Sequence, residues 1–214
     1  MSPVEIAQLI VYGATVGVIL AAPIGPINIE IVRRGIRDGF LHGWLMGLGA
    51  LTADTIYAMA IVTGFSRFAE NENLRVVLFL AGAAMMAWLG YNSLRTAFSG
   101  ADGETEAIVV PRSRTYLAGF MLAAFNPFGI VYWLTVGAGL AADAVSRFGE
   151  GSGPILVVGV MLGILTWVTS ISVVAQFSRR FVTGTGMRWI TGISAIALLG
   201  FAIWFLYSGI LLIF

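Results

Sequence analysis

The sequence contains no cysteine and no lysine, and its only histidine is His42. Disulfides, thiol redox relays, iron–sulfur clusters and zinc sites built from Cys and His are therefore excluded. The absence of lysine also excludes Schiff-base chemistry and a catalytic lysine. We expect no cofactor and no metal site.

Charge is scarce as well: charged residues make up 11% of the 214 residues, against roughly a quarter in an average soluble domain. Apolar residues reach 58% and the mean hydropathy is +0.92, so the composition favours a polytopic helical membrane protein. Twelve arginines and eleven acidic residues leave a net charge of +1. This balance provides no charge excess for binding nucleic acid.

Six apolar segments are long enough to cross a membrane. Each contains 24 to 28 residues, which is sufficient for a hydrocarbon layer about 30 Å thick even with tilt. They predict an all-α fold with six transmembrane helices in a single transmembrane domain, residues 1–214. The predicted spans are Ile6–Ile31, Phe40–Gly64, Leu74–Phe98, Tyr116–Ala142, Pro154–Phe177 and Met187–Phe214. Residues 1–8 contain no basic residue, so we expect the first span to be retained and not cleaved as a signal peptide.

The connections between these spans differ in their arginine content. Nine of the twelve arginines lie in the first, third and fifth connections or at the span ends beside them, and three lie in or beside the others. Because arginine-rich short loops stay in the cytoplasm, both termini are expected on the extracytoplasmic side of a bacterial inner membrane. The longest connection, residues 99–114, is hydrophilic and divides the chain into halves of three spans each, 1–98 and 115–214.

Two halves with an odd number of spans must be inverted relative to each other, an arrangement that recurs in secondary transporters. The first span of each half contains a Leu-Ala-Ala run before a proline-bearing interruption, at residues 20–28 and 122–129. The second span of each half carries small and polar residues at i, i+4, i+7 and i+11, which lie on one helix face. These residues are Gly43, Gly47, Ala50 and Asp54 in one half, and Gly159, Gly163, Thr166 and Ser170 in the other. A 3+3 inverted repeat is therefore predicted.

The prolines of the first span predict a broken helix. Pro23 and Pro26 each remove a backbone donor and clash with a carbonyl one turn back, and Gly25 between them adds flexibility. Backbone groups freed in this way inside a bilayer must be satisfied by protein, water or substrate, so broken helices line cavities. Asn28 follows the break and is able to donate and accept hydrogen bonds in such a cavity.

The fourth span contains a comparable pair, Asn126 and Pro127, which predicts a second break. A half-helix N-terminus at either break would offer free N–H groups and the positive end of a helix dipole to a substrate carboxylate. Thr166 and Ser170 make the middle of the fifth span polar. Their hydroxyl groups either face the same site or bond to carbonyls of their own helix, and the sequence leaves both interpretations open.

Asp54 is the acidic residue nearest the middle of a span. An ionised carboxylate at the bilayer centre costs about 2.5–3.5 kcal/mol on insertion scales, so such residues face a cavity or a partner. We interpret Asp54 as a group that exchanges a proton or binds a substrate ammonium; the alternative is a structural hydrogen bond between two helices. Tyr57, one turn later, either bonds to the carboxylate or the substrate, or packs in the interior.

Taken together, these features resemble the LysE/RhtB-type amino-acid exporters. The resemblance rests on the motif Pro-x-Gly-Pro-x-Asn at residues 23–28 followed by arginines, a glycine-rich second span with the central Asp54, and Asn-Pro at residues 126–127. It covers nearly the full chain in length and span order. It implies efflux of small amino acids or related solutes from the cytoplasm, powered by the proton gradient. Phe128 stands where the family often has a lysine, so no role of that lysine carries over.

We therefore expect a secondary active exporter of amino acids or related small solutes, not an enzyme, that works by proton antiport with alternating access. Asp54 is expected to carry the coupled proton. The expected partners are the small-molecule substrate, protons and membrane lipids, and glycine-lined helix faces are compatible with a homodimer. The residues expected to bind substrate are Pro23, Gly25, Pro26, Asn28, Asp54, Tyr57, Asn126, Pro127, Thr166 and Ser170.

Two alternative functions remain at the level of the sequence. One is a divalent-cation exporter of the same superfamily, and the other is a non-transporting scaffold or lipid-handling protein. An intramembrane aspartyl protease would need a second embedded Asp, and a rhomboid-like or metal-dependent site would need a central His. Neither residue is present in the middle of a predicted span.

Overall fold

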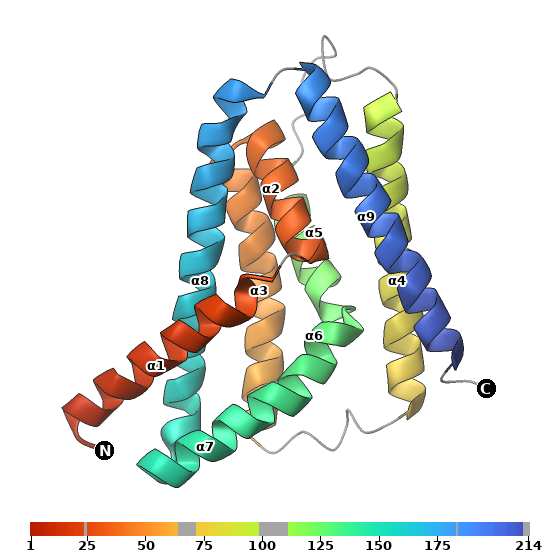
Figure 1. Cartoon of the computed structure of the whole chain (residues 1–214). Coiled ribbons are helices and arrows are strands. Elements are labelled where there is room, and N and C mark those ends of the chain that lie inside the picture. Colours follow the sequence, from red (N-terminus) through yellow and green to blue (C-terminus); the bar gives the residue numbers. More distant parts are fainter. Residues whose placement is uncertain (24, 64–71, 99–110, 183, 212–214) are drawn as a thin grey trace.

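A computed structural model describes residues 1–23, 25–63, 72–98, 111–182 and 184–211, apart from a few side chains within these ranges. Residues 99–110 of the expected hydrophilic loop lie outside the described residues. Regular secondary structure in the described ranges is helical throughout, as predicted. Four long helices run steeply through the molecule (Figure 1): α3 (Phe40–Val62), α4 (Glu72–Phe98), α8 (Ser152–Ser178) and α9 (Gly184–Leu211).

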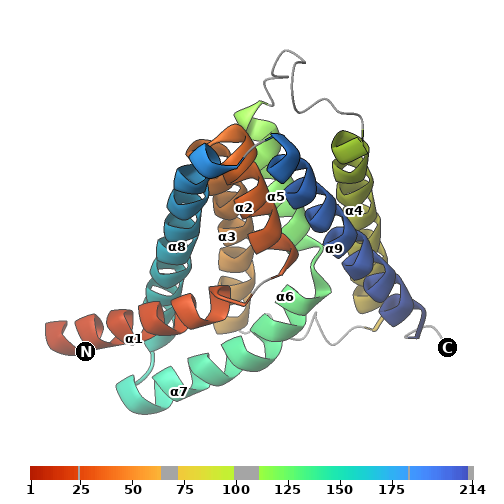
Figure 2. The same ribbon diagram turned by 45° about the horizontal axis from the view of Figure 1, so that its top comes forward.

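The first predicted span is interrupted where its prolines indicated. Helix α1 (Pro3–Ala21) is capped by the Ser2 side chain and ends before Pro23. Helix α2 (Pro26–Asp38) starts with Pro26 at its first position, where the missing N–H would have had no intrahelical partner. Figures 1 and 2 show that α1 runs obliquely across the bundle, whereas α2 turns upward beside α3.

A second interruption divides the fourth predicted span. Helix α5 (Arg112–Ala124) ends just before Asn126, and α6 (Pro127–Tyr132) begins at the adjacent proline. A π-helical turn, Trp133–Gly137, then leads into α7 (Ala138–Phe148). As in the first interruption, one segment stands upright and the other lies obliquely (Figure 2).

Each interrupted helix packs its first segment on a long helix of the other half of the chain. Helix α1 packs on α8, and α5 packs on α3. The helices α3 and α8 also contact each other, and α4 packs along α9. The upright segment α2 lies against α3, α8 and α9. The two interruptions are therefore held between the long helices of both halves.

Glycine allows these helices to approach closely. A Cβ atom built on Gly17 of α1 would overlap the carbonyl oxygen of Val160 in α8, and one on Gly119 of α5 would overlap the carbonyl oxygen of Met46 in α3. Small residues at such contacts let helix backbones touch directly, which is a common way to pack helices in membranes.

Four helical stretches among the described residues are long and apolar enough to cross a membrane. They are Pro3–Ala21, Phe40–Val62, Ser152–Phe181 and Gly184–Leu211. Large apolar side chains such as Val11 on α1, Val174 on α8 and Ile203 on α9 are exposed on the outside of the bundle. An outer surface of this kind suits a hydrocarbon environment.

We expect Gly119→Ala to lower the free energy of unfolding by about 1–3 kcal/mol, because overpacking in a tight contact forces the backbones apart. Gly200→Ala on α9 is the matched control, since a Cβ there meets no atom within 4 Å and alanine raises helix propensity by up to about 1 kcal/mol. Thermal unfolding of the detergent-purified proteins measures both changes. Equal stability of the two variants would contradict the backbone contact between α3 and α5.

Candidate functional site

A cavity of about 590 Å³ lies where the two interruptions meet the long helices. Its walls come from the break between α1 and α2, from α3, from α6 and the π-helical turn, and from α8 and α9. Six of the sequence-predicted site residues line it: Pro23, Gly25, Pro26, Asn28, Asp54 and Asn126. Residues separated by up to about a hundred positions in the sequence are thus brought to one cavity.

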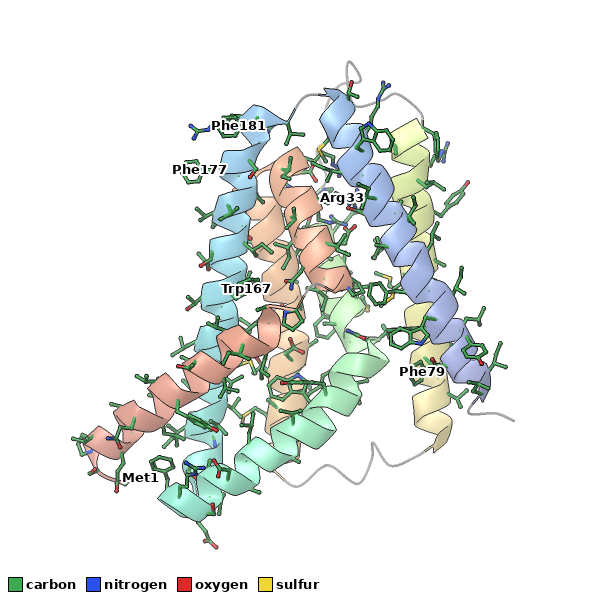
Figure 3. The ribbon with its side chains drawn as sticks, in the orientation of Figure 1. Met1, Arg33, Phe79, Trp167, Phe177 and Phe181 are labelled. Atoms are coloured by element: carbon green, nitrogen blue, oxygen red, sulfur yellow. The ribbon has the colours of Figure 1, made fainter. Side chains whose placement is uncertain are left out.

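Asn28 stabilises the first break. Its Nδ2 donates to the carbonyl oxygens of Ala21 and Pro23, at 2.8 Å each, and these carbonyls belong to the end of α1 and the break itself. Its Oδ1 accepts a hydrogen bond of 3.3 Å from Nε1 of Trp167 in α8, whose side chain reaches toward the break in Figure 3. Both donors of the Asn28 amide are therefore engaged by the protein, so this side chain shapes the break and the cavity wall.

Tyr57 stabilises the second break in a similar way. Its hydroxyl donates to the carbonyl oxygen of Ala124, the last residue of α5. Tyr57 is not among the residues that line the cavity. The structure shows no bond from Tyr57 to Asp54. Tyr57 packs against the buried core, which is the second of the two roles left open by the sequence, and its hydroxyl bonds to the backbone of α5.

Asp54 presents its carboxylate to the cavity. Its Oδ1 accepts a hydrogen bond of 3.0 Å from Nε1 of Trp133 in the π-helical turn. Among the described residues it forms no ion pair, and it is the one acidic residue in the cavity wall. Gly47 and Ala50 line the cavity on the same face of α3, as their spacing predicted.

Aromatic side chains form much of the remaining wall, and sequence reasoning missed them. Trp133, Trp167 and Trp204 line the cavity together with Tyr132 and Phe201. In a sequence rich in apolar residues these positions carry no distinguishing pattern. The π-helical turn that brings Trp133 to Asp54 has no sequence signal either, although such turns are frequent at functional sites.

Thr166 and Ser170 are not brought to the cavity. Both side chains are on the exposed side of α8, and their hydroxyls donate to carbonyls of their own helix, Leu162 and Thr166 respectively. The second of the two interpretations left open by the sequence therefore applies to them. The side chain of Pro127 lies outside the described residues, and its backbone begins α6.

No three His, Cys, Asp or Glu side chains come close enough together, in the part of the chain that the structure describes, to hold a metal ion.

Comparison with known proteins identifies the family. The model of the LysE type translocators matches residues 18–209. The chain belongs to this family. The resemblance noted from residues 23–28, Asp54 and residues 126–127 is thereby confirmed. A translocator family together with several long apolar helices makes the chain a multi-pass membrane protein.

Three relatives of this LysE type translocator span most of its length. It is 31% identical over 194 residues to YcgF of Bacillus subtilis, whose name describes amino acid efflux, and the alignment covers 91% of this chain and 93% of YcgF. It is 31% identical to the chemotactic transduction protein ChpE of Pseudomonas aeruginosa and 27% identical to the arginine exporter protein ArgO of Pectobacterium carotovorum, each with 77% of this chain and 79% of the relative covered. No solved structure matches the chain.

We expect Asn28→Asp to destabilise this translocator, because an ionised carboxylate cannot donate to the carbonyls of Ala21 and Pro23. Each buried acceptor left unsatisfied costs about 1–3 kcal/mol. Asn92→Asp is the matched control, since Asn92 also donates to a helix carbonyl, that of Trp88, but is exposed. Thermal unfolding in detergent gives the comparison, and a loss of stability in Asn92→Asp as large as that in Asn28→Asp would argue against this role of Asn28.

Proposed function

We propose that this translocator exports amino acids or related small solutes from the bacterial cytoplasm across the inner membrane, by alternating access and in exchange for protons. The observation that carries the proposal is Asp54, a carboxylate without an ion-pair partner among the described residues, in a cavity between two interrupted helices. The names of the relatives YcgF and ArgO, which describe amino acid efflux and arginine export, support the substrate class.

In the proposed topology the chain crosses the membrane six times, and both termini lie outside the cytoplasm. The segments α1 and α2 make up the first crossing, and α5, α6 and α7 make up the fourth. The packing supports an inverted 3+3 repeat: exchanging the two halves converts the α1–α8 pair into the α5–α3 pair and leaves the α3–α8 and α4–α9 pairs unchanged. In such repeats the substrate site lies between the halves near the midplane, where this cavity would lie.

The cavity suits a small zwitterion. Its volume of about 590 Å³ falls within the range of about 300–1,000 Å³ typical of small-molecule sites. The Asp54 carboxylate binds the substrate ammonium, and the N-terminus of α2, whose residues Ile27 and Asn28 line the cavity, presents its first N–H groups to the carboxylate. The indoles of Trp133 and Trp167 enclose the side chain of the substrate.

Proton coupling follows from competition at one carboxylate. When the cavity faces the cytoplasm, Asp54 releases its proton and the negative charge attracts the ammonium group of the substrate. When the cavity faces outward, a proton binds Asp54 and displaces that group. Because the proton and the substrate exclude each other at Asp54, each cycle exchanges one for the other, and the inward proton gradient drives export.

We expect Asp54→Asn to abolish transport driven by a pH gradient, because an asparagine cannot titrate. The assay uses proteoliposomes and a panel of labelled amino acids, with Mn²⁺ and Mg²⁺ as further solutes to test cation export. Asp143→Asn is the control, since Asp143 pairs with Arg147 on the exposed side of α7. Proton-driven transport at the wild-type rate in Asp54→Asn would refute the coupling role, and transport of the cations alone would favour the cation exporter.

We expect Trp133→Phe to slow transport about tenfold, because a hydrogen bond to a charged group contributes about 1.5–3 kcal/mol and orients the carboxylate. Phenylalanine keeps an aromatic ring in the cavity wall and removes the N–H. Trp88→Phe serves as control, because Trp88 is exposed on α4. Initial rates in the same proteoliposomes measure the effect, and identical rates in both variants would show that the bond between Trp133 and Asp54 has no part in transport.

A further inference from the structure

The second half of α2 contains a buried cluster of charged residues that the cavity does not include. Glu30 is fully buried, and Arg33 and Arg34 are only 4% and 8% exposed. Arginine and glutamate are almost never buried to this degree unless they are paired. The sequence places these three residues within two turns of one helix, and the structure places them inside the bundle.

The cluster has one positive charge in excess. Both oxygens of Glu30 accept hydrogen bonds from Arg33, through Nε and Nη2 at 2.8 Å each. Arg34 donates to the same carboxylate through Nε alone, at 3.0 Å. Among the described residues, the structure shows no acceptor for Arg34 besides Glu30, and the next acid along α2, Asp38, pairs with Arg37. One carboxylate therefore faces two guanidinium groups.

A buried cation without a full set of partners is costly, because the interior replaces only part of its hydration. A bound anion would remove this cost by neutralising the excess charge. The planar edge of a guanidinium group fits a carboxylate through two parallel hydrogen bonds. The chemistry of the Arg34 side chain thus selects an oxyanion, and a carboxylate fits it best.

The position of Arg34 connects it to the cavity. Ile27, Ile31 and Arg34 follow the spacing i, i+4 and i+7, so they share one face of α2, and Ile27 and Ile31 line the cavity. Arg34 therefore lies just beyond the cavity, toward the Asp38 end of α2. Figure 3 shows the neighbouring Arg33 side chain extending from α2 toward α9.

Asp54 lies in the wall of the cavity, further from the Asp38 end of α2 than Arg34. A Cβ on Gly43 of α3 would contact the backbone of Ile31 and Gly35, so Gly43 is level with the middle of α2. Asp54 is eleven residues further along α3, which corresponds to roughly 16 Å at 1.5 Å per residue. The backbones of Arg34 and Asp54 are therefore at different levels of the bundle, with Asp54 in the cavity wall and Arg34 nearer the Asp38 end of α2.

Buried hydroxyl groups add polar character at the same end of the bundle. Ser93 on α4, Thr115 on α5 and Thr191 on α9 are at most 1% exposed, and their hydroxyl oxygens have no partner among the described residues. Helices α5 and α9 both contact α2, and α4 contacts α5 and α9. Unsatisfied buried hydroxyls are rare in folded proteins, and three of them at one end indicate a region that admits a polar ligand.

We infer that Arg34, held by Glu30 beside Arg33, forms a substrate uptake site at which the carboxylate of an amino acid binds before it reaches the cavity. This inference rests on the proposed function. The Arg34 site recognises the carboxylate end of the substrate, whereas Asp54 recognises the ammonium end. The translocator therefore selects molecules that carry both groups and rejects amines that lack a carboxylate.

The test measures uptake into inverted membrane vesicles, in which the cytoplasmic face is accessible. The probes are L-arginine, L-leucine, L-threonine and L-alanine, each with its carboxamide as competitor. In Arg34→Gln we expect KM to rise about tenfold or more, with little change in kcat, because a charge-assisted pair is lost. Arg34→Lys keeps the charge without the planar edge and should give an intermediate KM.

Arg37→Gln is the matched control, because Arg37 lies one turn further along α2 and pairs with Asp38 at the surface. Its KM should stay within about twofold of wild type, as expected for a partly exposed ion pair. The wild-type protein provides a second readout that needs no variant: the carboxamides should compete about tenfold more weakly than the amino acids. Thermal unfolding shows whether each variant is folded. If Arg34→Gln does not fold, the KM of Arg34→Lys and the competition by carboxamides test the Arg34 site instead.

The outcomes separate this inference from the proposed function. Wild-type KM in Arg34→Gln, or equal competition by carboxamides and amino acids, overturns the Arg34 site and leaves the exporter intact. Failure of the wild type to move any of the four amino acids overturns the proposed function and the inference with it. In nanodiscs, stabilisation that depends on Arg34 and on phosphatidylglycerol, but not on amino acids, would assign the bound oxyanion to a lipid phosphate and overturn the inference.

Discussion

Every backbone carbonyl at a helix break inside an apolar bundle needs a donor, and this requirement governs the architecture of the translocator. At the first break, Asn28 donates to the carbonyls of Ala21 and Pro23. At the second, Tyr57 donates to the carbonyl of Ala124. Because the protein itself satisfies these carbonyls, each interrupted helix keeps its bend without a bound solute. The cavity between the bends is therefore a property of the fold and not of the ligand.

Close helix contacts hold these bends in place. Glycine lets α1 lie directly on α8 and α5 directly on α3, so the first segment of each interrupted helix is fixed to a long helix of the opposite half. The second segments extend the connection across the cavity, since Trp133 in the π-helical turn bonds to Asp54 of α3. In α8, Trp167 bonds to Asn28 of α2. Four hydrogen-bonding side chains thus couple the two halves at the place where alternating access would require them to move.

Among the described residues, charge inside the bundle lies in two places with opposite character. Asp54 presents one negative group to the cavity, and the Glu30, Arg33 and Arg34 cluster presents an excess positive group closer to the end of α2. Apolar and aromatic side chains occupy the wall between them. Each charged group costs free energy in this environment, and the zwitterionic substrate proposed above would offset the cost of both.

The sequence by itself determined the all-helical class, the family, the two proline-bearing interruptions and the place of Asp54 beside a cavity, because these follow from local composition and backbone chemistry. It also placed Gly47 and Ala50 on the face of Asp54, since helical spacing is a local property. Only the tertiary structure decided which polar groups share a cavity. Thr166 and Ser170 have the spacing of the site but lie on the exposed side of α8, whereas Trp133 and Trp167 reach the cavity from positions without a pattern. Helix rotation and the π-helical turn depend on contacts between segments distant in the sequence, and such contacts leave no local signal.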